Sequence, residues 1–252
     1  MSDPMRMNMA SASESLRPLA LLAAGKTGAD IERLVREERA RCRRKSLPLT
    51  WDVLEETLRR DDGAFSDEVR YRIAVHEIGH ALALEMTGLG EVVSVRLHAS
   101  GGTTKTLLNR DRLQFAEGIG GNLTCVLGGR AAETVVFGET LVGSGGGSHS
   151  DLGQATLLAL ELETALGLGG DVPLVFRMPT NPGETLLYNS TLAERVQKRL
   201  ENAERHALEL LEPYRELISD LGHRLIRAQA LEGEAIRTAL AACAGAGEEG
   251  PS

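Results

Sequence analysis

Residues 66–88 read SDEVRYRIAVHEIGHALALEMTG, a stretch with a helix signal at each end. Ser66 is a typical helix N-cap, and Asp67 and Glu68 suit the positive end of a helix. Gly88 is a typical residue just beyond a helix C-terminus, because it adopts a left-handed backbone without steric cost. The stretch therefore predicts one capped helix with an apolar body, running from about Ser66 to Thr87.

Within this helix, His76-Glu77-Ile78-Gly79-His80 carries the chemistry. Residues four apart on a helix lie one turn above each other, so His76 and His80 can bind the same ion. Glu77 projects from an adjoining part of the helix surface, where it can act on a water molecule rather than on the ion. Zinc makes such a water acidic enough for Glu77 to take its proton. The pattern predicts a zinc-dependent peptidase with Glu77 as the catalytic base.

A zinc hydrolase needs a third protein ligand and one open position. Metzincins continue the pattern with Gly and then His, but Ala83 and Met86 occupy those places here, which excludes that class. Glu85 is too near in sequence and lies on the wrong turn. The residues alone leave the third ligand open among Glu117, Glu133, Glu139, His149 and Asp151.

Three stretches occur in order: HEIGHALALEMTG at 76–88, GGRAAETVVFGE at 128–139 and SGGGSHSDLGQAT at 144–156. With them, the chain from about Ser66 to the last helix resembles the peptidase domain of the FtsH family of ATP-dependent zinc metalloproteases. The resemblance implies that His76, His80 and Asp151 bind Zn²⁺ and that Glu77 is catalytic. It also implies that Glu133 supports the site and that His149 is a loop neighbour.

The segment from Leu19 to Leu58, with TGADIERLV and LPLTWDVLEETL, is similar to the last helices of the family's AAA ATPase module, its lid. Gly25-Lys26-Thr27 looks like the end of a phosphate-binding loop, but Ala20 stands where that loop needs glycine. We therefore expect no ATPase activity from this chain. It reads either as a fragment of a longer protein or as a natural peptidase remnant.

We divide the chain into a disordered N-terminus (1–16), an AAA-lid-like helical segment (17–62), an FtsH-like zinc peptidase domain (63–243) and a disordered tail (244–252). The expected fold is mainly α with a small β-hairpin at 91–108. Further helices are expected at 111–137, as one or two, and at 150–166, 191–219, 221–231 and from 232. Residues 167–190 are expected to be irregular.

The composition indicates the fold class, the kind of partner and the cellular compartment. The 252 residues are 42% apolar and 3% aromatic, which favours helices over strands, and the net charge of −8 argues against nucleic acid as a partner. Cys42, Cys125 and Cys243 form no metal-binding or disulfide pattern, which favours a reducing compartment. We expect a cytoplasmic protein without a signal peptide or a membrane span.

The resemblance implies an endopeptidase that cleaves unfolded polypeptides bound as an added strand along the hairpin edge. It also implies a homo-oligomer, a hexamer by analogy. The peptidase would act either alone or with an ATPase supplied in trans. The alternative is a catalytically weak oligomerisation or scaffold module that keeps zinc for structure. The intact Glu77 favours the enzyme, because a structural zinc site needs no general base.

Overall fold

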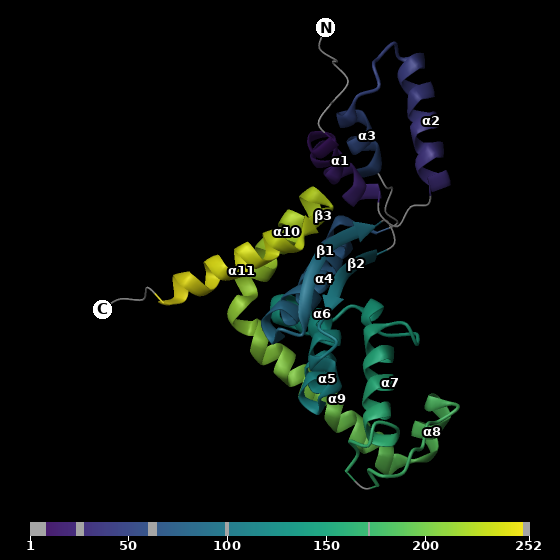
Figure 1. The fold of residues 1–252 in the computed structure, drawn as a ribbon, viewed down its shortest axis with the longest axis vertical. Helices are drawn as coiled ribbons and strands as arrows, with labels where there is room; N and C mark the ends of the chain where they lie inside the picture. The colour runs from purple at the N-terminus through teal and green to yellow at the C-terminus, as the bar shows by residue number, and fades with distance from the viewer. Residues whose placement is uncertain (1–8, 24–27, 60–64, 99–100, 171, 249–252) are drawn as a thin grey trace.

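The structure, a computed structural model, describes residues 9–23, 28–59, 65–98, 101–170 and 172–248. Helices and one small sheet make up the described chain (Figure 1). The helices are α1 (Met9–Ala23), α2 (Gly28–Arg44), α3 (Trp51–Arg59), α4 (Asp67–Thr87), α5 (Ala116–Val126), α6 (Gly128–Phe137), α7 (Asp151–Thr164), α8 (Pro182–Tyr188), α9 (Ser190–Leu211), α10 (Arg215–Ala228) and α11 (Gly233–Glu248). The strands are β1 (Gly90–His98), β2 (Gly101–Leu108) and β3 (Ala230–Glu232), and short 3₁₀ turns are η1 (Arg112–Gln114), η2 (Val142–Ser144) and η3 (Glu212–Tyr214). The predicted fold class, mainly α with a small hairpin, is confirmed.

Helix α4 begins and ends where its sequence predicts. The Ser66 Oγ accepts a hydrogen bond from the Val69 N–H at 3.3 Å, which satisfies one of the free donors of the first turn. Gly88 has φ 62° and donates its N–H to the Glu85 carbonyl. Local signals alone therefore fix the helix that carries the metal-binding pattern.

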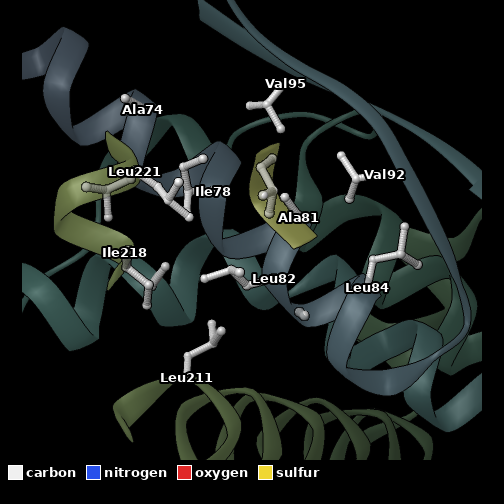
Figure 2. Close-up of a cluster of buried hydrophobic side chains, with 14 of the residues drawn as sticks. Ala74, Ile78, Ala81, Leu82, Leu84, Val92, Val95, Leu211, Ile218 and Leu221 are labelled. Atoms are coloured by element: carbon white, nitrogen blue, oxygen red, sulfur yellow. The ribbon is translucent and has the colours of Figure 1, made fainter. Parts of the chain in front are cut away.

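The main hydrophobic core surrounds α4. Ile78 and Leu82 are fully buried and lie among side chains from β1, α9 and α10 (Figure 2). These neighbours include Val95, Leu211 and Leu221, which are also fully buried. Because α4 is covered by apolar side chains from several elements, its polar residues 76, 77 and 80 can reach a cleft only on its remaining side.

The sheet is antiparallel with the strand order β2-β1-β3. Strand β1 pairs with β2 from Gly90↔Leu108 to His98↔Gly101, with an irregularity between Val92 and Ser94. Strand β2 therefore lies at an edge of the described sheet, where backbone groups are open to a further strand. The hairpin was predicted, but the short β3 was not.

A second hydrophobic cluster positions α7. Ala159 and Leu160 of α7 are buried with Leu123 of α5 and Val196 of α9. This cluster places the first residue of α7, Asp151, next to the histidines of α4. Among the described residues no helix is both long and apolar enough to cross a bilayer.

Several boundaries differ from the prediction. Helix α1 begins at Met9, although disorder was predicted through residue 16, and its Arg17 pairs with Glu232 at 2.5 Å. Helix α11 continues to Glu248, beyond the predicted end at 243. The break between the last long helices falls at Pro213 in η3, because proline has no N–H to donate, rather than near residue 220. Residues 1–8, Gly25-Lys26-Thr27 and 249–252 lie outside the described residues.

Helices α4 and α6 cross closely because glycines meet at the contact. A Cβ built on Gly79 would lie 2.5 Å from the Ala132 Cβ and nearer still to the Gly128 carbonyl oxygen. A Cβ on Gly128 would lie 2.8 Å from the Ala83 Cβ. The two backbones can therefore approach this closely only without side chains at these two positions.

We predict that Gly79→Ala destabilises the fold. A buried clash costs about 1–3 kcal/mol, although Gly→Ala inside a helix normally stabilises by about 0.5–1 kcal/mol. The matched control is Gly120→Ala in α5, where an added Cβ would meet nothing within 4 Å. Urea unfolding of the metal-free proteins measures both, and equal effects of the two substitutions would contradict the packing described for α4 and α6.

Candidate metal centre

His76, His80 and Asp151 come together in the structure although α4 and α7 lie far apart in sequence. The His76 Nε2 is 3.0 Å from the His80 Nε2 and 2.8 Å from the Asp151 Oδ2, and the His80 Nε2 is 3.4 Å from that same oxygen. Among the described residues, this is the group of three whose ligand atoms lie close enough to share one ion. Of the five residues that the sequence left open for a third ligand, the fold thus brings Asp151 to the two histidines.

The donor set fits zinc. Around a tetrahedral zinc with bonds of about 2.0–2.1 Å, ligand atoms lie about 3.3 Å apart. The three separations here, 2.8, 3.0 and 3.4 Å, are close to that value. Gly129 of α6 faces the same point: a Cβ there would lie 2.6 Å from the Nε2 atoms of both histidines. The absence of a side chain at residue 129 keeps this space open.

The Nδ1 atom of each imidazole makes a hydrogen bond that fixes the orientation of the ring. The His76 Nδ1 donates to the Glu133 Oε1 at 2.5 Å, and the His80 Nδ1 donates to the Cys125 carbonyl oxygen at 2.9 Å. The other Glu133 oxygen accepts the Leu141 N–H, and this carboxylate is 1% exposed. Both rings are therefore oriented with Nε2 toward the shared point, as in typical metal sites. Glu133 lies behind the donor group rather than in it.

The electrostatics match a cation site. Burial would lower the pKa of His76, but hydrogen bonds to Asp151 and Glu133 outweigh it and raise that pKa to about 10. Burial would raise the pKa of Asp151, but the hydrogen bonds from His76 and His80 keep it well below its usual value. In the metal-free protein, the proton on His76 thus supplies the positive charge between the Asp151 and Glu133 carboxylates that an ion would otherwise supply.

Comparison with known proteins places the chain in a family. Residues 64–239 match the sequence model of peptidase family M41. The chain belongs to peptidase family M41. It is 30% identical over 260 residues to the ATP-dependent zinc metalloprotease FtsH of Thermobaculum terrenum, covering 94% of this chain and 39% of that relative.

Two further relatives carry the same description. The ATP-dependent zinc metalloprotease FtsH 1 of Symbiobacterium thermophilum is 33% identical over 242 residues, which is 90% of this chain and 39% of the relative. FtsH of Mycobacterium tuberculosis is 29% identical over 245 residues, 87% of this chain and 32% of the relative. The M41 chain thus spans roughly a third to two fifths of the length of these relatives. Their names imply zinc, which fits the His-His-Asp group.

In this M41 chain, Glu77 stands beside the donor group without joining it. Its side chain is buried, with 8% exposed, and its Oε2 accepts a hydrogen bond from the Thr104 hydroxyl of β2 at 2.7 Å. Gly102 of β2 also lies against the same carboxylate. Sequence reasoning missed Thr104 and Gly102, because only the docking of the hairpin on α4 brings them to Glu77.

Two adjoining clefts meet at the centre and share His76, Glu77, Gly102, His149 and Asp151. The first, of about 640 Å³, has polar walls that include Thr103, Thr106, Asn122 and Gln154. The second, of about 490 Å³, has apolar walls that include Phe65, Val69, Ile73, Leu141 and Val142. A larger groove of about 690 Å³, lined by Leu89 and Phe115, contains none of the donor group, so its size does not make it the site.

The other sequence candidates lie elsewhere. Glu117 lines that larger groove. Glu139 pairs with Arg72 at 2.8 Å. His149 lines both clefts without entering the donor group, as expected for a loop neighbour. Glu85 accepts the Val92 N–H at 2.7 Å and pairs with Arg237 at 2.9 Å, so it is committed to packing.

Local structure also explains how Asp151 is placed. The Ser150 Oγ caps α7 by accepting the Gly153 N–H at 3.2 Å and donates to the Gly147 carbonyl oxygen at 2.6 Å. Gly153 packs against that same carbonyl. The glycine-rich loop is thus fixed to the first turn of α7, which holds Asp151 facing the two histidines.

We predict that Gly129→Ala greatly weakens zinc binding although every predicted ligand remains. The new methyl group would lie where the two Nε2 atoms converge, so a zinc ion could not keep its bond lengths. A loss of about a hundredfold or more in affinity is expected, by analogy with damaged metal sites. Chelator competition measures it, and Gly120→Ala is the control. Unchanged affinity in Gly129→Ala would place the metal elsewhere.

Zinc affinity should rise with pH. In the metal-free protein His76 stays protonated up to a pKa of about 10, and zinc must displace that proton from Nε2. Affinity should therefore increase by up to about tenfold per pH unit between about pH 6 and 9. Glu133→Gln removes one carboxylate that raises this pKa and should flatten the dependence. Calorimetry in two buffers of different ionisation enthalpy counts the released protons; an affinity independent of pH would contradict this expectation.

Proposed function

We propose that this chain is a zinc-dependent endopeptidase that hydrolyses peptide bonds of unfolded polypeptides. The observation that carries the proposal is a set of three converging ligand atoms with a buried carboxylate, Glu77, beside them and two adjoining clefts that meet there. Membership of peptidase family M41 supports the reaction class. His76, His80 and Asp151 would hold the zinc, and Glu77 would be the general base.

Each residue has a separate task in this proposal. Zinc, when bound, supplies Lewis-acid chemistry that acidifies water and polarises the scissile carbonyl. Glu77 takes one proton from the attacking water and delivers it to the leaving amine nitrogen. Glu133 and the Cys125 carbonyl keep both imidazoles in the tautomer that presents Nε2. No covalent intermediate with the protein is needed.

The shape of the site suits an extended chain. A segment crossing from the polar to the apolar cleft would pass Glu77 and the donor group. It would run near the open edge of β2, where its backbone could pair as an added strand. A folded protein could not offer such a segment, which favours unfolded polypeptides and peptides as substrates.

Assembly and partners are part of the same proposal. Large apolar side chains stand exposed at Leu174, Phe176, Leu187 and Tyr188, with exposed fractions of 97%, 74%, 80% and 88%. Such surfaces favour an interface, here with further copies of the chain as a homo-oligomer, for which a hexamer is the working hypothesis. The relatives are named ATP-dependent. We propose that a separate ATPase works with this chain in trans. The chain itself would be a cytoplasmic peptidase domain, residues 63–243, preceded by a lid-like segment, residues 17–62.

Hydrolysis of unfolded casein without ATP tests the proposal. The zinc-loaded wild type should cleave, and Glu77→Gln should lose about 10²–10⁴-fold in rate, because Gln cannot accept the proton. The two side chains are nearly the same size, so zinc content and melting temperature should match. Both are measured on the same preparations.

Two results would count against the proposed endopeptidase activity with Glu77 as its general base. If neither protein cleaves although each holds one zinc, the site is structural or depends on an ATPase, and the scaffold alternative gains. If Glu77→Gln cleaves as fast as the wild type, the activity comes from another group or from a contaminating protease. Light scattering separately tests the homo-oligomer, and a single monomer peak would contradict it.

A further inference from the structure

Among the described residues, Thr104 of β2 is the close polar partner that another element offers to the Glu77 side chain. The Thr104 Oγ1 lies 2.7 Å from the Glu77 Oε2 and 3.0 Å from the Glu77 carbonyl oxygen. A threonine hydroxyl has a single proton, so it donates to one of these two oxygens at a time. The shorter contact goes to the carboxylate, and hydrogen bonds to an ionised acceptor are the stronger class.

A second residue of β2 limits the same carboxylate from another direction. A Cβ built on Gly102 would lie 2.7 Å from the Glu77 Oε1 and nearer still to its Cγ. Residues two apart on a strand point to the same face. Gly102 and Thr104 therefore line the same face of β2. Residue 102 leaves space for the Glu77 side chain, and residue 104 offers that side chain a hydroxyl.

The geometry points to Thr104 as a positioning residue: it holds the Glu77 carboxylate toward the ion site, and Gly102 leaves it the space to lie there. This inference rests on the proposed function, since it concerns how the carboxylate of the general base, Glu77, is oriented. Among the described residues, the Thr104 hydroxyl is the side-chain donor that reaches this carboxylate.

Such positioning matters because the glutamate side chain is long. Its three rotatable bonds allow the carboxylate to turn away from the reacting water, and a misplacement of about 1 Å can cost a hundredfold in rate. The helix fixes only the Cα and Cβ of Glu77. The hairpin therefore supplies the restraint that the motif helix alone lacks.

Thr104→Val tests the hydroxyl, because valine keeps the shape and loses the donor. We expect kcat on a peptide substrate to fall about tenfold to a hundredfold. KM and bound zinc should stay within about twofold, because neither the ligands nor the cleft walls change shape. Thr104→Ser restores the donor and should recover most of kcat.

The matched control is Thr57→Val in α3. The Thr57 hydroxyl donates to the Val53 carbonyl oxygen at 2.7 Å within the same helix, and Thr57 lines neither of the two clefts at the centre. The Thr57→Val substitution should therefore leave kcat unchanged. Gly102→Ala approaches from the other direction: the hydroxyl stays, but the new methyl group displaces the carboxylate, so kcat should fall while zinc is retained.

A second measurement does not depend on activity. In the metal-free protein, a double-mutant cycle of Thr104→Val and Glu77→Ala is followed by melting temperature. If the two side chains interact, the double variant should melt less far below the wild type than the two single shifts summed.

The outcomes separate the two proposals. Normal kcat in Thr104→Val, no recovery in Thr104→Ser, or additive melting shifts would each overturn the positioning role. A wild type that cleaves nothing would overturn the proposed function, and the cycle would then decide alone whether Thr104 holds Glu77. A kcat loss with unchanged KM, recovery by serine and non-additive melting together establish it.

Discussion

The close approach of α4 and α6 at Gly79 and Gly128 is the contact on which the metal centre depends. Because no side chain separates the two backbones there, residues one position and five positions further along α6 reach the histidines of α4. Gly129 then leaves the space between the imidazoles open, and Glu133 arrives behind His76. A wider crossing would fill that space with side chains and take the carboxylate out of reach.

The centre also lies where two hydrophobic clusters meet. The main core holds α4, α6 and the sheet, whereas the second cluster holds α7 with α5 and α9. Helix α9 belongs to both, through Leu211 in the first and Val196 in the second. Its 22 residues run beside both groups of helices (Figure 1). Helix α5 likewise contributes Cys125 to the first cluster and Leu123 to the second, so these two shared helices set the distance between the histidines and Asp151.

The sequence predicts most of what depends on local signals. Ser66 and Gly88 define α4 without tertiary information, and the alternation around Val95 defines the hairpin. Strand β3 was out of reach because three residues carry no periodicity, and its pairing arises only when α10 brings it to β1. The helix break lies earlier than predicted, because Pro213 ends α9 although apolar residues continue at helical spacing beyond it.

The candidate site divides in the same way. His76, Glu77 and His80 follow from helix spacing alone. Asp151 follows only from resemblance to a family, since spacing left five candidates for its place. Thr104 and Gly129 could not be found from the sequence by any argument about periodicity. Their roles exist only where the hairpin and α6 meet α4, and polar or small residues at such positions look like ordinary surface or packing choices.

The position of the centre between two clusters has a consequence for cooperativity. Helix α4 packs in the first cluster and α7 in the second, so local opening can expose either helix by itself, although α5 and α9 contribute to both clusters. An ion bound to His76, His80 and Asp151 has ligands on both helices and is lost if either one opens. Metal binding would therefore couple the local opening of α4 to that of α7, and amides of the two helices would exchange together rather than separately.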